Sequence, residues 1–124
     1  MARRSSRRRR RATAAEQAQA AYALLSAVID MGEASTDDAH ARYELPTSVD
    51  QREWGIVTGR MVAECIIRRV GDDHTRRRVA HGRRIGRYRT TDLERARQYR
   101  DTLATTARQR PAQRELFDSG EGEP

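Results

Sequence analysis

The chain of 124 residues is long enough for one small domain with tails, and its single tryptophan, four tyrosines and one phenylalanine allow only a thin core. Such a core argues against an enzyme with a deep active-site pocket. The net charge of +7 indicates a polyanionic partner, and all 25 basic side chains are arginines.

Residues 1–12 form a strongly basic arm, MARRSSRRRRRA, which we expect to stay disordered until it meets nucleic acid. An arginine-rich start before the apolar stretch 20–29 is also a feature of secretory signals. That stretch is short, however, Glu16 interrupts its approach and Asp30 ends it. No stretch approaches the ~20 apolar residues of a membrane helix. We therefore expect a cytoplasmic protein without a membrane partner.

Two helices are predicted in the first part of the folded domain. From Thr13 onward, apolar residues recur at helical spacing, and Gly32 is a natural helix end. A second helix should begin at Ser35 or Thr36 as the N-cap, and it should end before Pro46. The wide apolar face of the first helix must be buried against another element.

A third helix should begin near Ser48 or Asp50 and pack on the first helix through one apolar face. The residues of this face are Trp54, Val57, Met61, Val62 and Cys65. Trp54 should be substantially buried. Cys65 is the only cysteine, so it permits no internal disulfide, and we interpret it as a small core residue in a reducing compartment.

The opposite face of this third helix is small or cationic, which favours insertion into a DNA major groove. Arginine pairs with guanine edges and glutamine with adenine edges, so Gln51, Arg52 and Arg60 are the candidate readers of base sequence. Gly55 and Gly59 would let the backbone approach phosphates closely. The alternative is the solvated face of an ordinary packed helix.

The segment after the third helix changes to the pattern of a basic β-hairpin. Turn signals occur at Gly71-Asp72-Asp73 and at His81-Gly82, and residues 84–90 alternate as a strand does. A basic hairpin next to a helix is suited to phosphate contacts. The candidate DNA-binding arginines of this segment are Arg76, Arg77, Arg78, Arg83 and Arg84.

The order WG at 54–55, IIRRVG at 66–71, TRRR at 75–78 and HGRR at 81–84, before a strand with tyrosine, resembles small winged-helix proteins of actinobacteria and their phages. The resemblance covers residues 20–91. It implies a winged helix-turn-helix domain, which we place at residues 13–91, and binding of double-stranded DNA. The expected fold class is mainly α with a small β-hairpin.

Residues 92–110 are predicted to form an extra C-terminal helix, capped by Thr90 or Thr91 and ending before Pro111. Its apolar stripe is thin. The stripe packs either on the first helix or on the same helix of a second subunit, which would make the protein a homodimer.

Residues 111–124 are polar and acidic and are expected to be disordered, but they contain Gln113-Arg114-Glu115-Leu116-Phe117. This resembles the pentapeptide with which bacterial polymerases and repair proteins dock on the β sliding clamp. The resemblance implies clamp binding through Gln113, Leu116 and Phe117. Arg114 departs from the pattern, in which leucine is usual. The alternative is that Leu116 and Phe117 pack on the domain.

No catalytic or cofactor-binding pattern is found. His40, His74 and His81 lack metal-ligand spacing among themselves and with Cys65, and we interpret them as surface or phosphate-contacting residues. We therefore expect neither an enzyme nor a cofactor. The favoured function is a DNA-binding accessory protein recruited to the replisome by its clamp-binding tail. The alternatives are a winged-helix transcriptional regulator with an inert tail, and an assembly protein whose basic surface binds RNA or an acidic partner.

Overall fold

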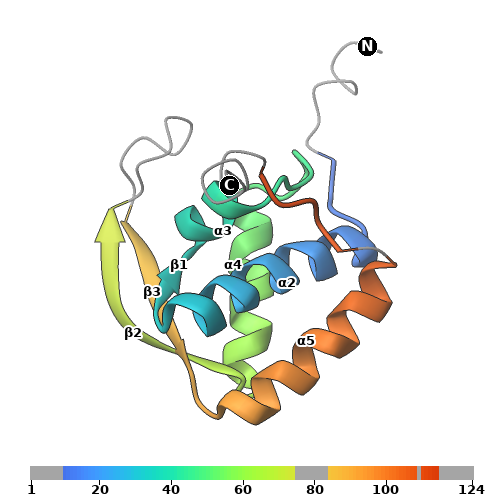
Figure 1. Ribbon diagram of the computed structural model, residues 1–124. Coiled ribbons are helices and arrows are strands. Elements are labelled where there is room, and N and C mark those ends of the chain that lie inside the picture. The colour runs from blue at the N-terminus through green and yellow to red at the C-terminus, as the bar shows by residue number, and fades with distance from the viewer. Residues whose placement is uncertain (1–9, 75–83, 109, 115–124) are drawn as a thin grey trace, which may run out of the picture.

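The computed structural model describes residues 10–74, 84–108 and 110–114. Within these ranges the chain forms four helices and a three-stranded antiparallel sheet (Figure 1). The helices are α2 (Ala14–Met31), α3 (Thr36–Arg42), α4 (Gln51–Ala63) and α5 (Leu93–Ala107). The strands are β1 (Ala34–Ser35), β2 (Ile67–His74) and β3 (Arg84–Thr90). The content is thus mixed α/β, with one strand more than the expected hairpin.

Three of the helices begin at a residue whose side chain accepts a hydrogen bond from the backbone three residues later. Thr13 caps α2 and forms a capping box with Glu16, and Asp50 caps α4. These two helix starts confirm the prediction. The cap of α5 is Asp92 rather than Thr90 or Thr91. Thr91 instead donates its hydroxyl to the carbonyl of Cys65.

The sheet has the order β1-β3-β2, so β3 lies between the other two strands. β1 pairs with β3 through Ala34 opposite Tyr88, and a bulge interrupts the pairing of β2 with β3 between Arg69 and Gly71. A Cβ atom at Gly86 would lie 2.8 Å from the hydroxyl of Tyr88. Glycine at position 86 therefore lets the Tyr88 side chain fold back along β3.

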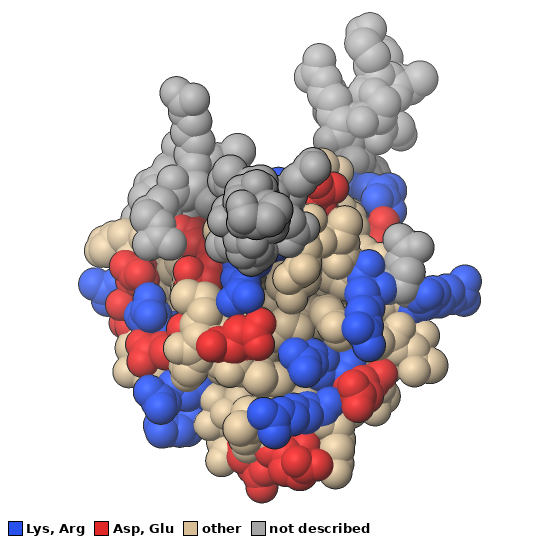
Figure 2. Space-filling model, in the orientation of Figure 1, with Lys and Arg blue, Asp and Glu red and all other residues tan. Residues whose placement is uncertain are grey.

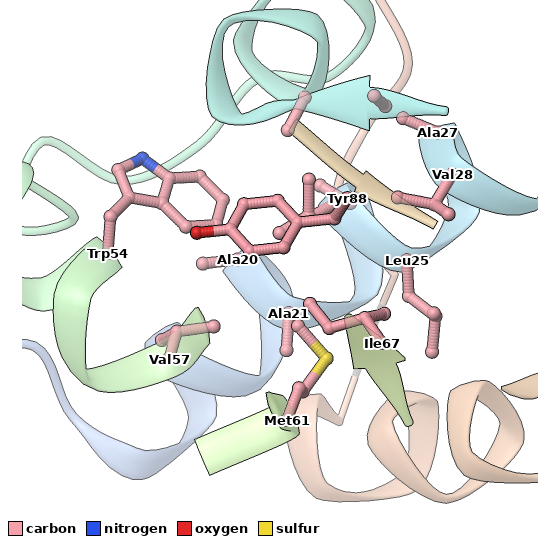
Figure 3. Close-up of a cluster of buried hydrophobic side chains, with 14 of the residues drawn as sticks. Ala20, Ala21, Leu25, Ala27, Val28, Trp54, Val57, Met61, Ile67 and Tyr88 are labelled. Atoms are coloured by element: carbon pink, nitrogen blue, oxygen red, sulfur yellow. The ribbon is translucent and has the colours of Figure 1, made fainter. Parts of the chain in front are cut away.

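The core is built around α2, which is covered on most sides by the other elements. Figure 3 shows Trp54, Val57 and Met61 of α4 facing the apolar side chains of α2, with Tyr88 of β3 among them. Trp54 is only 4% exposed, which confirms its predicted burial. The small side chains of α2, such as the fully buried Ala20, allow the helices to approach closely.

Two residues of the predicted apolar face of α4 are not buried. The helix ends at Ala63, and Cys65 follows with a φ of 60° in the turn towards β2. Because this left-handed conformation redirects the side chain, Cys65 is exposed. Val62 is 41% exposed. The interpretation of Cys65 as a core residue was therefore wrong.

The helix α5 packs along α2 within the same chain (Figure 1). Ala96 and Ala107 are buried, and Tyr99 and Leu103 are partly buried against the core. Most of the thin apolar stripe of α5 is therefore covered within the chain, while Leu93 at its start is 44% exposed. No helix in the described part of the chain is long and apolar enough to span a membrane.

The start of the C-terminal tail is held against the end of α3, although disorder was expected from residue 111. Gln113 forms an isolated antiparallel bridge with Tyr43, and the backbone N–H of Arg114 donates to the Arg42 carbonyl at 2.9 Å. Nε of Arg114 donates to the His40 carbonyl at 2.6 Å. The last carbonyls of a helix lack intrahelical partners, and Arg114 supplies donors to two of them. Residues 115–124 lie outside the described residues.

Candidate nucleic-acid interface

Most residues on the outward face of α4 are exposed. Gln51, Arg52, Gly55 and Gly59 are exposed, and a Cβ atom at either glycine would have no neighbour within 4 Å. The acidic residue of this helix, Glu53, is fully buried and so does not contribute to the face. The structure therefore brings Gln51 and Arg52 together at the N-terminal end of an exposed helix face that carries no acidic side chain.

Arg60 lies on the flank of α4 rather than on the face that carries Arg52. Eight residues separate the two, which corresponds to a rotation of about 80° around the helix axis. Arg60 lines a groove between α2, α4 and α5 together with Tyr99. Burial raises the pKa of the Tyr99 phenol and the Glu64 carboxylate raises it further, whereas Arg60 lowers it. Arg60 is thus exposed as expected, at one edge of the outward side of α4.

The hairpin arginine Arg87 is bound by two carboxylates. Its Nε lies 2.6 Å from Oε2 of Glu33, and its Nη1 lies 3.2 Å from Oδ2 of Asp73. The hydrogen bond with Glu33 raises the pKa of Arg87 and lowers the pKa of Glu33. Glu33 was not predicted as a partner, because 54 residues separate it from Arg87 and no local pattern joins them.

The predicted DNA-binding residue Arg84 is also close to an acidic side chain. Its Nη1 lies 3.8 Å from Oδ2 of Asp72, which is bound as well by Arg69 on the same strand. Part of the positive charge of the hairpin is therefore balanced within the chain. The other four predicted hairpin residues, Arg76, Arg77, Arg78 and Arg83, lie outside the described residues.

The base of the N-terminal arm is tied to α4 by a buried carboxylate. Oε2 of Glu53 accepts hydrogen bonds from Nε of Arg11 at 3.0 Å and from the backbone N–H of Ala12 at 3.3 Å. Its Oε1 accepts from the side-chain amide of Gln17 at 2.9 Å. The side chain of Glu53 has no exposed surface, whereas that of Arg11 is 64% exposed. One signal in the sequence could have indicated this contact: Glu53 is an acidic residue beside the apolar face of α4.

A second carboxylate binds the preceding arginine of the arm. Arg10 lies 3.2 Å from Oε2 of Glu16, on the first turn of α2. The hydrogen bond from Arg10 is the main reason that the pKa of Glu16 falls from 4.5 to about 2, and those from the Thr13 backbone and the Ser48 hydroxyl act in the same direction. Two successive arginines of the arm are thus bound by two different helices.

In the predicted clamp-binding segment, the described residues are Gln113 and Arg114. The side chain of Gln113 is exposed, whereas that of Arg114 turns towards the carbonyl of His40. Leu116 and Phe117 lie outside the described residues. The departure of Arg114 from the clamp-binding pattern thus coincides with a structural role at the end of α3.

The histidines differ in their surroundings. His40 was expected on the surface, but its Nε2 accepts a hydrogen bond from the buried Trp54. His74 is exposed at the end of β2, and His81 lies outside the described residues. Across the described ranges, no three His, Cys, Asp or Glu side chains are grouped so that they could hold a metal ion.

Charges of both signs are interspersed on the face seen in Figure 2. Opposite charges this close together weaken the field that a polyanion would experience. A scan of the chain against protein-family models gives no match, and searches of curated proteins and of solved structures give none. The residues of α4, the hairpin and the arm are therefore the basis for a functional proposal.

Proposed function

We propose that this chain is a winged-helix protein that binds double-stranded DNA through α4 and the β2–β3 hairpin. The order of the elements supports this class: a helix, a short strand, two helices and an antiparallel hairpin. The sheet order β1-β3-β2 has the short first strand against the second strand of the hairpin. In helix-turn-helix proteins the second helix of the pair is the recognition helix, which here is α4.

The observation that carries the proposal is the division of α4 into two unlike faces. Trp54, Val57 and Met61 are buried on one side. The other side has no acidic side chain, and its exposed residues include Arg52, Gly55, Gly59 and Ala63, while Ile56 is partly buried. A helix enters the major groove when its outward side chains are small or match the base edges. Gln51 and Arg52, at the N-terminal end, are the candidate readers of base sequence.

Phosphate contacts are assigned mainly to the arm and to the tip of the hairpin. Because carboxylates of the same chain partly balance the charges of Arg84 and Arg87, these two arginines should attract phosphates less strongly. The residues assigned to phosphates are Arg3, Arg4, Arg7, Arg8 and Arg9 of the arm and Arg76, Arg77, Arg78 and Arg83 of the hairpin. Contacts of this kind supply affinity without sequence preference.

A second candidate function is docking on a sliding clamp through residues 113–117, which would make the protein a replisome accessory factor. The exposed amide of Gln113 on an extended backbone supports it. The binding of Arg114 to α3 supports the alternative, a winged-helix transcriptional regulator whose tail does not bind a clamp. The two alternatives share DNA binding and differ in the role of Leu116 and Phe117.

The test of DNA binding is a fluorescence anisotropy titration of a labelled duplex with the full chain. Arg52→Ala should weaken binding by about 1–3 kcal/mol if Arg52 contacts a guanine. The control is Arg97→Ala, which removes the same charge from an exposed position of α5 and should change affinity little. If the unaltered chain binds no duplex even at about 50 mM salt, where phosphate contacts are strongest, the proposal fails.

A further inference from the structure

Glu53 is an acidic side chain at a buried position of α4, and its contacts lead out of the core. It lies next to Arg52 in the first turn of the helix. Its carboxylate binds Arg11 and the backbone N–H of Ala12, both of which belong to the arm. Glu53 therefore joins the arm to the helix that is proposed to enter the major groove.

Stability does not explain this choice of residue well. A buried carboxylate loses its hydration, and a pair of this kind is often no more stable than well-packed apolar side chains. Here the partner Arg11 is itself 64% exposed, so solvent weakens the attraction. The contact does fix geometry, because two donors from consecutive residues of the arm converge on one oxygen, Oε2 of Glu53.

The attachment point places the arm at the end of α4 that carries Gln51 and Arg52. Residues 1–9 precede this point and include five arginines. Nine residues span at most about 30 Å when extended, which is enough to follow a duplex for several base pairs from the recognition helix. The cap at Thr13 and the ion pair of Arg10 with Glu16 hold the chain against α2, whereas the contacts of Glu53 hold it against α4.

We propose that Glu53 is a positioning residue that directs the arginine arm along duplex DNA bound by α4, so that the arm and the N-terminal end of α4 form one interaction surface. This inference rests on the proposed DNA binding. A chain segment that is held beside its binding surface encounters that surface at a higher effective concentration than a segment that can extend in any direction.

The test is a cycle of four proteins: the full chain, the chain without residues 1–9, Glu53→Gln, and the combination of both changes. Each is titrated with a labelled duplex at several salt concentrations. In the unaltered chain, loss of the five arginines should weaken binding at least about tenfold. In the Glu53→Gln background the same deletion should weaken binding by about threefold or less, because the ion pair that holds the arm against α4 is lost. The control background, Glu94→Gln on α5, should keep the full effect of the deletion.

Arg11→Gln provides a second background that leaves the buried side of α4 unchanged, since Arg11 is largely exposed. Arg11→Gln should also reduce the effect of the deletion on DNA affinity. If circular dichroism shows that Glu53→Gln is unfolded, the Arg11→Gln background becomes the test of the inference. A merely structural role of Glu53 would lower the melting temperature but leave the effect of the deletion unchanged, and that result overturns the inference.

The failure of DNA binding itself has a different signature. If the unaltered chain binds no duplex, the proposed function falls and the inference falls with it. If the chain binds DNA but deletion of residues 1–9 has no effect, the inference is overturned while DNA binding by α4 stands. A reduced effect of the deletion in the Glu53→Gln and Arg11→Gln backgrounds, with a full effect in Glu94→Gln, supports both.

Discussion

The indole nitrogen of Trp54 donates a hydrogen bond of 2.8 Å to Nε2 of His40. The two rings meet edge to face with their centroids 5.6 Å apart, which connects α4 to α3. The carbonyl of the same histidine accepts from Arg114. Three segments that are distant in the sequence therefore meet at His40. The Nε2 atom that accepts this bond carries no proton of its own.

Two substitutions of Trp54 should distinguish the stability that the packed ring contributes from the stability that its hydrogen bond contributes. Trp54→Ala should reduce the free energy of unfolding by about 3–5 kcal/mol, because it leaves a large cavity in a small core. Trp54→Phe keeps most of the apolar contact but removes the hydrogen bond between the indole and His40, and should cost about 1–2 kcal/mol. Urea unfolding followed by circular dichroism measures both. A Trp54→Ala protein of unchanged stability would contradict the packing of α4 on α2.

The capping role of Arg114 predicts an unequal effect of two truncations. Deletion of residues 115–124 should leave the melting temperature nearly unchanged, whereas deletion of residues 113–124 should lower it. Arg114→Ala should cost about 1.5–3 kcal/mol, the range for hydrogen bonds to charged groups. Thermal unfolding compares these proteins. Equal melting temperatures for both truncations would show that the segment 110–114 does not stabilise α3.

The lowered pKa of Glu16 predicts how stability depends on pH. Its pKa is about 2 in the folded protein and 4.5 as an ordinary carboxyl, so the ionised form stabilises the fold. This contribution is complete above pH 4.5 and is lost as the pH falls towards about 2. Glu16→Gln should therefore be less stable than the unaltered chain at pH 7, and the difference should shrink between these two values. Glu94→Gln, which removes one negative charge from an exposed part of α5, is the matched control.

The hairpin arginines predict a change in the salt dependence of DNA binding. A plot of log affinity against log salt concentration loses about 0.9 units of slope for each phosphate contact removed. Replacing Arg76, Arg77 and Arg78 together with alanine should therefore flatten the slope by up to about three units without unfolding the domain. Replacing Arg95, Arg97 and Arg108 of the α5 region is the matched control. An unchanged slope in the hairpin variant would show that these hairpin arginines do not contact the DNA phosphates.

A peptide covering residues 110–120 should bind a bacterial β clamp if the tail is a linear clamp ligand. We expect micromolar affinity, about −8 kcal/mol, and tighter binding when leucine replaces Arg114. In the full chain, replacing Leu116 and Phe117 with alanine should abolish clamp binding and leave DNA affinity unchanged. A peptide that does not bind, together with a double variant that loses thermal stability, would instead place these side chains in the core.

Local patterns predicted the helices well, because caps such as Thr13 and Asp50 and the buried face around Trp54 depend on near neighbours in the sequence. The strand β1 was missed, since two residues carry no periodicity and pair with a strand more than fifty residues later. Cys65 was misplaced, because a helical wheel assumes that the helix continues to that residue.

The candidate site was less predictable than the fold. Gln51 and Arg52 lie on the exposed face as expected. The partners of the arginines could not be read from the sequence, because Glu33 and Arg87 come together only when β1 and β3 pair, and Glu53 meets Arg11 only when α2 and α4 pack. Contacts between elements, rather than patterns within them, determine which charges are balanced.

The exposed Cys65 gives the protein a single thiol at the end of α4 opposite to Gln51. Because the chain has one cysteine, a maleimide dye or spin label would attach at this one position in the otherwise unaltered sequence. The helix extends about 20 Å between its two ends, so the label would lie away from the bases that Arg52 is proposed to contact. Energy transfer from this label to a dye on the duplex would report the direction in which α4 enters the groove.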